Sequence, residues 1–311
     1  MNRTDKNEIL VSIICNAYNH ELYIRDALEG FVMQKTDFAF EILVHDDAST
    51  DNTANIIREY EAKYPELIKP IYQTENQYSK GNGDVSRIQQ GRAKGKYIAF
   101  CEGDDYWTDP YKLQKQFDAL EANPDIDMCA HAARAVNATT GDEMYIVAPS
   151  QIDTVFPAED VILGGGGFVA SASLFFRSEL YIDPPEFRRF LRMDVTLQIH
   201  GALRGGLLYL SDCMSVYRVM SKGSWSQRMA ADKERRNKHF EKVQQMFNIL
   251  DRETDGKYST VIEQKKIKNE FDHYISIGQC RMIIKKKYRS ELMRRSFADR
   301  VKIVIKAIIK R

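Results

Sequence analysis

The sequence lacks the usual marks of secreted and membrane-spanning proteins. Its five cysteines are odd in number and lie far apart, so no close pair is available to chelate zinc. This usage indicates free thiols in a reducing cytoplasm rather than a disulfide framework. No run approaches the ~18 apolar residues that a membrane span needs, and the polar start of the chain is unlike a signal peptide. We therefore expect a cytoplasmic protein that does not cross a membrane.

The 311 residues carry a net charge of only +1, but the two signs are distributed unevenly along the chain. Basic residues are the minority in the first part, and acidic residues are the minority in the second. Residues 1–225 hold 22 Lys and Arg against 33 Asp and Glu, whereas residues 226–311 hold 23 against 11, giving −11 and +12. The two parts therefore have different kinds of partner. We predict one domain over residues 1–225 and a basic helical region over residues 226–311.

Strand and helix patterns alternate through the first hundred residues. Short β-branched or aromatic runs without charge indicate strands, and stretches with one apolar face indicate helices between them. We expect strands at 9–15, 41–45, 67–72 and 96–100, with helices at 21–33, 52–64 and 85–94. This order predicts an α/β fold with a mostly parallel sheet.

Paired aspartates follow two of the expected strands, Asp46-Asp47 after one and Asp104-Asp105 after another. Loops at the carboxyl ends of strands in open α/β sheets are where ligands bind. Adjacent carboxylates repel unless a cation or a set of donors lies between them, and Mg²⁺ or Mn²⁺ bridging to substrate phosphates is a common remedy. For Asp104-Asp105 alone, a capped turn that starts a helix near Pro110 is an equally good interpretation.

Glycine loops that cradle phosphate are missing from this nucleotide-binding outline. The chain has neither G-x-x-x-x-G-K-[ST] nor a G-x-G-x-x-G after the first strand. A metal held by Asp104 and Asp105 would supply the positive charge that such loops otherwise provide. This absence and the acidic pair point to the same metal site.

Three motifs carry a resemblance to a known family. They are residues 11–19 (VSIICNAYN), residues 41–51 (EILVHDDASTD) and residues 95–105 (GKYIAFCEGDD). In this order and spacing they resemble family 2 glycosyltransferases of the GT-A fold, and with later elements the resemblance covers roughly residues 9–225. It implies a GT-A domain with a mostly parallel mixed sheet, followed here by a helical C-terminal extension.

The resemblance assigns donor-binding roles residue by residue. It implies that Cys15 and Asn16 border the base, with Tyr18 in the same loop, and that Asp47 accepts the base N–H. It further implies that Asp104 faces the ribose. The family usually has Thr, Ser or Pro near the position of Cys15.

Metal and catalytic roles follow from the same resemblance. Asp105 would bind Mn²⁺ or Mg²⁺, and Asp194 would be the general base. Taken alone, Asp194 reads as an ordinary helix N-cap. The family often has His where this chain has Met220, and Lys222, Ser224 or Trp225 are the candidate substitutes.

The glycine run at residues 164–167 stands before an apolar stretch at 168–177. We interpret it as a flexible loop that leads into a strand, rather than as a direct sugar contact. Such a loop would border the acceptor side.

The C-terminal region has helical periodicity, with helices expected at 232–250, 260–287 and 291–310. Residues 281–311 carry 12 basic and 2 acidic side chains, and the last helix has an apolar stripe. A basic amphipathic helix of this kind can lie on an anionic membrane surface. The alternatives are a helix packed on the catalytic domain and a homodimer arm. Nucleic-acid binding is disfavoured, because no aromatic side chains interleave with the charge.

Together these features predict an inverting, metal-dependent glycosyltransferase. The donor would be a nucleotide-sugar, most readily a UDP-sugar, and the acceptor a hydroxyl of a glycan or a lipid-linked precursor. The protein would be cytoplasmic or peripheral on the inner membrane face. Two alternatives stay open: a nucleotidyltransferase that makes a sugar-nucleotide, and a non-catalytic nucleotide-sugar-binding scaffold.

Overall fold

A computed structural model describes residues 8–81, 84–221 and 225–309. The chain forms two compact units. The first contains Met1–Pro184 and Arg192–Ser224, and the second contains Pro185–Leu191 and Trp225–Arg311. The second unit therefore takes a short segment from within the first as well as the C-terminal region.

The N-terminal half of the sheet in the first unit is parallel, in the order β3-β2-β1-β4. Its strands are β1 (Ile9–Ala17), β2 (Ala39–Asp46), β3 (Ile68–Tyr72) and β4 (Tyr97–Phe100). The uncharged β-branched runs suit strands that are covered on both faces. All four strand expectations are confirmed, with shifts of a few residues at the ends.

The sheet continues with mixed strands in the order β9-β6-β10-β5. Strand β6 (Met128–Asn137) runs parallel to β10 (Leu207–Val219), whereas β9 (Phe175–Arg177) is antiparallel to both β4 and β6. Three short strands pair at the margins: β5 (Tyr106–Trp107), β7 (Glu143–Val147) and β8 (Thr154–Phe156). The expected mixed α/β fold is confirmed.

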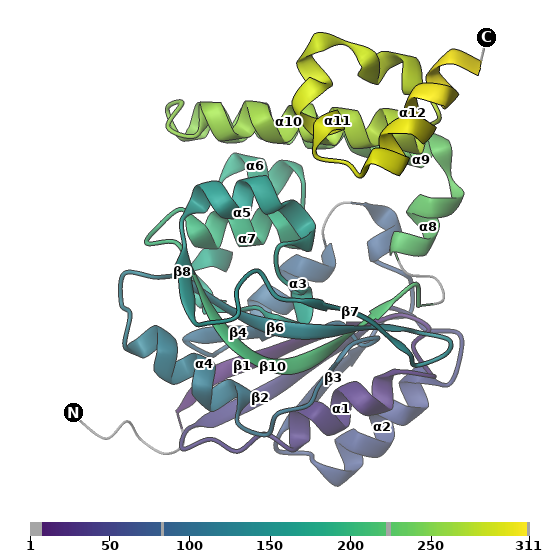
Figure 1. Ribbon diagram of the computed structural model, residues 1–311. Helices are drawn as coiled ribbons and strands as arrows, with labels where there is room; N and C mark the ends of the chain where they lie inside the picture. Colours follow the sequence, from purple (N-terminus) through teal and green to yellow (C-terminus); the bar gives the residue numbers. More distant parts are fainter. Residues whose placement is uncertain (1–7, 82–83, 222–224, 310–311) are drawn as a thin grey trace. The chain divides into compact units, whose positions relative to one another are not determined.

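Helices cover both faces of this sheet (Figure 1). On one face lie α1 (Ile24–Val32), α2 (Thr53–Lys63) and α4 (Lys112–Glu121), whose apolar residues join the main core. On the other lie α3 (Asp84–Arg92), α5 (Ala158–Gly164) and α7 (Asp194–Ala202). This layering leaves the carboxyl ends of β1, β2 and β4 clear of helices, so the site has to be sought there.

The glycine run does not form the flexible loop that we expected. Gly164 ends α5, and Gly165–Gly167 form a single 3₁₀ turn, η2, that packs on α7. A Cβ on Gly164 would lie 2.3 Å from the Phe168 ring, so this glycine permits close packing. The expected strand over 168–177 is also wrong, because only Phe175–Arg177 pair in the sheet and a second 3₁₀ turn, η3 (Ser171–Ser173), precedes them.

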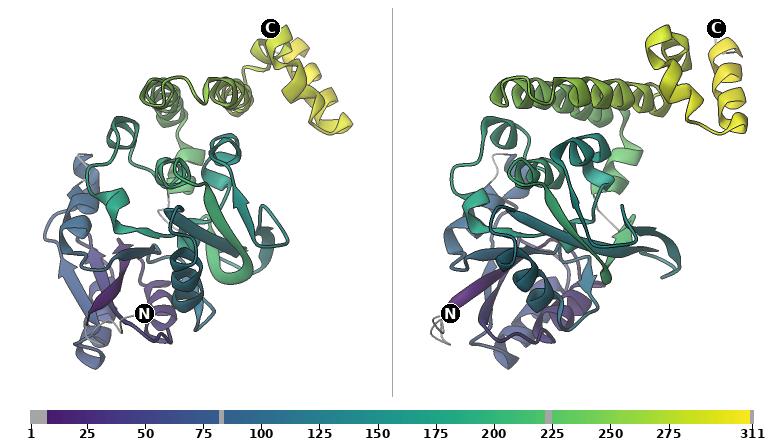
Figure 2. Two further views of the ribbon diagram at one scale, coloured as in Figure 1. Left: turned by 90° about the vertical axis from the view of Figure 1, so that its left-hand side faces the viewer. Right: turned by 60° about the vertical axis from the view of Figure 1, so that its left-hand side comes forward.

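The second unit consists of helices. Helices α9 (Lys233–Glu253) and α10 (Ser259–Ser276) lie side by side (Figure 2), preceded by α8 (Trp225–Ala231). Helix α6 (Glu186–Phe190) packs on α9, where the Glu253 carboxylate accepts the backbone N–H groups of Glu186 (2.8 Å) and Phe187 (2.9 Å). This carboxylate satisfies N–H groups at the start of α6 that have no partner within the helix.

The expected helix over 260–287 is broken. Helix α10 ends at Ser276, and Gly278 adopts a φ of 76°, which favours glycine and turns the chain. Two 3₁₀ turns follow, η5 (Cys280–Ile284) and η6 (Lys286–Tyr288), and then α11 (Arg289–Met293) and α12 (Phe297–Ile309). A small core of Phe271, Ile283, Tyr288 and Ile303 holds these pieces together.

None of the helices formed by residues 8–81, 84–221 and 225–309 combines the length and the apolar character that a bilayer crossing needs.

Lys112 is a fully buried ammonium group in the core of the first unit. Its Nζ donates to Gln116 Oε1 (2.7 Å) and lies 3.9 Å from the centre of the Trp107 ring. Burial lowers the pKa of Lys112 to about 7. The folded state therefore disfavours the charged form, and the unfolded chain binds more protons between pH 7 and 10. Stability should rise with pH across this window.

We expect Lys112→Met to flatten this rise, because methionine fills the space without carrying a proton. The free energy of unfolding, measured with urea at several pH values, should lose up to about 1.4 kcal/mol per pH unit of slope. The exposed Lys69→Met variant should keep the slope of the parent. An unchanged slope in Lys112→Met would mean that Lys112 is not the titrating group.

Candidate active site

The loop between β4 and β5 carries the acidic corner, residues 102–105. Cys101 N–H donates to Ile14 O (3.1 Å) and Gly103 N–H to Asn16 O (2.9 Å), so the loop continues the alignment of β4 with β1. A Cβ on Gly103 would lie 2.9 Å from both His20 Nδ1 and the Ile24 side chain. Glycine therefore lets the acidic corner lie directly against the loop that follows β1.

Arg218 on β10 fixes this corner. Its backbone N–H donates to Asp105 Oδ1 (2.8 Å), its Nη1 donates to Asp104 O (2.9 Å), and its Nη2 pairs with Asp26 of α1. The guanidinium also lies 4.4 Å from the Tyr106 ring centre and 5.2 Å from that of Tyr23. One side chain thus links the acidic corner to a helix and a distant strand.

The two adjacent aspartates differ in their surroundings. Asp105 is 2% exposed, and one carboxylate oxygen accepts the Arg218 N–H. Asp104 is half-buried, and its Oδ2 accepts the Ser221 hydroxyl (2.6 Å). Ser221 follows Met220, whose φ of 63° is unusual for a non-glycine residue and is typical of functional loops. Of the two aspartates, Asp104 is the more open to solvent.

Burial, with a further contribution from like charge, disfavours ionisation at this corner. Burial raises the pKa of Asp105 well above its ordinary value, and the Asp104 carboxylate raises it further. Burial also raises the pKa of Glu102 to about 8, with added contributions from Asp104 and Asp194 and an opposing hydrogen bond from Asn16. Because burial and like charge both disfavour the ionised forms, this site favours a cation.

Asp194 is the first residue of α7, and Met193 occupies the N-cap position. The interpretation of Asp194 as an ordinary N-cap is therefore wrong. Its Oδ1 accepts the Val195 N–H (2.7 Å), yet burial raises the pKa of Asp194 above its ordinary value. A helix N-terminus favours the ionised form of a nearby carboxylate, but loss of hydration outweighs this effect at Asp194, and a more basic carboxylate results.

The Asp47 carboxylate, just after β2, is held by the loop that follows β3. Asp47 is 4% exposed, and its two carboxylate oxygens accept the N–H groups of Gln77 (2.7 Å) and Tyr78 (3.0 Å). These donors stand at the start of a 3₁₀ turn, η1 (Tyr78–Lys80), which Asp47 therefore positions. The sequence indicates a polar loop over residues 74–84, but its hydrogen bonds to Asp47 were not predicted, because the loop residues have no periodic pattern.

The residues predicted to border the base are arranged unequally. The Cys15 side chain is fully buried in the core, which leaves only its backbone to border a ligand. Asn16 hydrogen-bonds with Glu102, and its Oδ1 accepts from Gln89 Nε2 (3.3 Å), so it links the first loop to the acidic corner. Tyr18 is 41% exposed and open to stacking.

The structure brings several of the predicted residues together. Asn16, Asp104 and Asp105 lie at one corner, and the Asp194 carboxylate is close enough to contribute to the raised pKa of Glu102. In the part of the chain that the structure describes, no three His, Cys, Asp or Glu side chains are grouped to hold a metal ion. Lys222 and Ser224, suggested as substitutes for the family histidine, lie outside the described residues, as does the side chain of Trp225.

Comparison with known proteins identifies the family. Residues 12–179 match the model of glycosyl transferase family 2. An uncharacterised protein of Mycobacterium tuberculosis, Rv1520, is 36% identical over 224 residues, or 69% of this chain and 60% of that protein. The putative teichuronic acid biosynthesis glycosyltransferase TuaG of Bacillus subtilis is 27% identical, over 72% of this chain and 84% of that protein. The chain belongs to glycosyl transferase family 2, and spans about 60% of the length of the first of these relatives.

Solved structures show the same fold. S. aureus TarS 1-349 in complex with UDP-GlcNAc superposes with a TM-score of 0.64 at 18% identity, covering 95% of this chain and 82% of that one. The mannosyltransferase PcManGT from Pyrobaculum calidifontis, in complex with GDP-Man and Mn²⁺, gives a TM-score of 0.57 at 16% identity, covering 98% and 88%. The GT-A fold implied by the sequence motifs is confirmed.

Proposed function

We propose that the protein is an inverting, metal-dependent glycosyltransferase that moves a sugar from a nucleotide-diphosphate donor to a hydroxyl acceptor. The observation that carries the proposal is the buried acidic corner at the end of β4, with the Asp194 carboxylate within electrostatic reach of Glu102. UDP-sugars are the first donors to consider, because TarS was solved in complex with UDP-GlcNAc. Family membership supports the reaction class.

A divalent ion, Mn²⁺ or Mg²⁺, fits the residues of this corner. Such ions bind one or two carboxylates together with substrate phosphates, so a set of three protein ligands is not required. Asp104 offers the more open carboxylate, and Asp105, the next residue and more deeply buried, is the one that we assign to the metal. When bound, the ion would stabilise the negative charge that develops on the leaving diphosphate.

The chain's own residues supply the remaining steps. We assign the nucleoside to the loops after β1 and β2, with Tyr18 beside the base, Asn16 at its border and Asp47 facing its N–H. Asp194 would take the proton of the acceptor hydroxyl, a step worth roughly 10²–10⁴-fold in rate. With the leaving group and the base on opposite sides of the transferred carbon, displacement inverts the anomeric centre.

The acceptor is assigned only by class. TuaG, the B. subtilis relative, is named for teichuronic acid biosynthesis, which favours a glycan or a lipid-linked glycan precursor of the cell envelope. A nucleotidyltransferase is disfavoured, because the first strand is not followed by a glycine-rich phosphate loop.

The metal assignment is tested by calorimetry with UDP in the presence and absence of Mn²⁺. We expect Asp104→Asn and Asp105→Asn each to lose the metal-dependent part of the UDP affinity, because each substitution replaces a charged carboxylate with a neutral amide. Asparagine keeps an oxygen that can accept the Arg218 N–H, so misfolding is not the expected cause. The exposed Asp212→Asn variant is the charge-matched control. Full metal-dependent affinity in Asp105→Asn would remove Asp105 from the metal site.

The base assignment is tested with Asp194→Asn. The amide oxygen still accepts the Val195 N–H, so thermal stability and UDP affinity should be retained. An amide does not take up the acceptor proton, so turnover should fall by ~10² or more. Turnover close to that of the parent would leave Asp194 as a structural residue and move the search for the base to Glu102.

We also propose that the second unit contacts an anionic membrane surface through α12. Phe297, Val301, Val304 and Ile305 are all exposed, between 37% and 74%, and their spacing places them on one face of the helix. Ile303 and Ala307 are buried on another face. The face formed by Phe297, Val301, Val304 and Ile305 is open to solvent, and residues 281–311 carry a net charge of +10. Both properties suit a peripheral helix.

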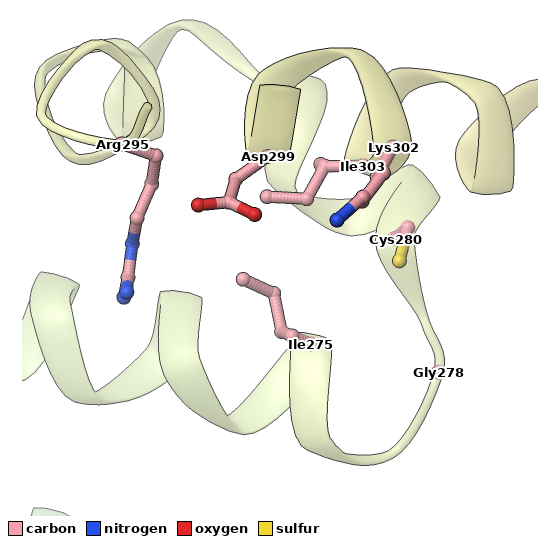
Figure 3. A pocket seen from close by; sticks show the side chains of 7 residues that line it. All are labelled: Ile275, Gly278, Cys280, Arg295, Asp299, Lys302 and Ile303. Carbon is pink, nitrogen blue, oxygen red and sulfur yellow. The ribbon is translucent and has the colours of Figure 1, made fainter. Parts of the chain in front are cut away.

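A pocket of about 430 Å³ lies beneath α12 in the same unit (Figure 3). Ile275 of α10 points toward Asp299 and Ile303, while Arg295 and Lys302 flank the Asp299 carboxylate. Its mixed charges give it no single ligand preference. We therefore base the membrane proposal on the exposed face of α12 and not on this pocket.

A homodimer through the same face is the competing arrangement. It would bring together two segments that each carry +10, and their repulsion disfavours it at low salt. An anionic surface instead attracts each nearby basic side chain by about 1 kcal/mol.

We expect the full-length protein to bind vesicles containing roughly one-third phosphatidylglycerol in phosphatidylcholine at low salt, and to be released by added salt. Phe297→Ser combined with Ile305→Ser should weaken this binding without unfolding the unit, because both side chains are exposed. Ile182→Ser, equally exposed but in the first unit, is the matched control. Equal binding by all variants, or a dimer at low salt in sedimentation, would contradict the membrane proposal.

A further inference from the structure

Two tyrosines stand in one row across three adjacent strands. Tyr217 on β10 is in register with Ala135 on β6, and Ala135 is in register with Tyr145 on β7. Residues in register on neighbouring strands project from the same face of a sheet. The two phenol rings therefore stand on the same face, on either side of the small methyl group of Ala135.

The pair is open to solvent and has unused hydrogen-bonding capacity. Tyr145 is 50% exposed and Tyr217 is half-buried, whereas Ala135 between them is fully buried. Neither phenol hydroxyl has a hydrogen-bond partner among residues 8–81, 84–221 and 225–309. Burial raises the pKa of Tyr217 to about 12, so its hydroxyl remains a donor at neutral pH. The pair therefore offers ring faces together with free polar tips.

The row lies beside the acidic corner. The carboxylates of Asp105, Asp104 and Asp194 are close enough to add to the rise in the pKa of Tyr217. Tyr145, across the row, contributes to the same rise. Arg218, the next residue on β10, donates its backbone N–H to the Asp105 carboxylate. In the order of strands, β6 and β10 lie beyond β4, on the side opposite β2, which carries Asp47. The tyrosines thus lie past the acidic corner as seen from the proposed nucleoside loops.

Aromatic faces next to carboxylates suit a pyranose ring. One face of a pyranose presents C–H groups to the negative face of an aromatic ring, while its hydroxyls donate to carboxylates. Resting on the function proposed above, we propose that Tyr145 and Tyr217 form a subsite for a sugar ring of the acceptor, held next to Asp194. The donor sugar is bound through its diphosphate at the corner, whereas an acceptor has no such anchor and depends on contacts of this kind.

The test uses methyl α- and β-glycosides of glucose, galactose, mannose and N-acetylglucosamine as probes. Saturation-transfer NMR on the full-length protein, with UDP and diamagnetic Mg²⁺, reports which ring protons touch the protein. We expect saturation on the C–H groups of one ring face for at least one glycoside. Its affinity should fall about threefold to tenfold in Tyr145→Ala and stay within about twofold in Tyr145→Phe, which keeps the ring.

Two comparisons separate the possible outcomes. Tyr111→Ala, which removes a tyrosine of similar exposure elsewhere in the unit, should leave glycoside binding unchanged. UDP affinity should be the same in Tyr145→Ala as in the parent. If Tyr145→Ala instead weakens UDP-sugar binding relative to UDP, the pair belongs to the donor sugar and the proposal is wrong.

The same experiment distinguishes this inference from the proposed function. Glycoside binding without any binding of UDP, GDP or dTDP would sink the transferase proposal while leaving a sugar subsite. UDP binding with no saturation of any glycoside, or saturation that persists in Tyr145→Ala, would overturn the subsite. In that case the tyrosines would only cover Ala135.

Discussion

Burial of neighbouring carboxyl groups at the end of β4 is the constraint on which the site in the first unit depends. Glu102, Asp104 and Asp105 lie within four residues, and burial makes the ionised forms of Glu102 and Asp105 costly. A chain without other requirements would place an apolar or neutral turn here. The corner persists because Arg218, Ser221 and Asn16 supply the hydrogen bonds that hold it. The remaining cost of ionising these carboxyl groups is one that a bound cation would offset.

The two aspartates of the pair differ in burial and in hydrogen-bond partners. Asp105 is buried and tied to the β10 backbone, so it sets the position of the loop. Asp104 is more open, and it meets Ser221 next to the left-handed Met220. Two further non-glycine residues with positive φ, Asn19 and Ala48, stand in the loops after β1 and β2. Three of the five non-glycine residues with positive φ among the described residues thus lie in the loops after β1, β2 and β10.

Sequence reasoning predicted the parallel half of the sheet because each of its strands is a short uncharged run that can be recognised locally. It failed where structure depends on distant partners. Strands β5 and β9 have two and three residues, too few for a period, and Gly278 broke a helix whose apolar pattern continued past it. Arg218 and Asp26 are 192 residues apart, so no local pattern reveals that they pair. The acidic motifs were recognisable, but the burial that separates Asp104 from Asp105 was not.

The central claim is that this corner supports transfer of a sugar with release of a nucleoside diphosphate. Product analysis by ³¹P NMR after incubation with UDP-, GDP- and dTDP-sugars tests it most directly, since even slow transfer to water releases the diphosphate. We expect one donor to yield its nucleoside diphosphate only when Mn²⁺ or Mg²⁺ is present. Release of pyrophosphate from a nucleoside triphosphate and a sugar phosphate would indicate nucleotidyl transfer instead, and binding without any product would indicate a scaffold.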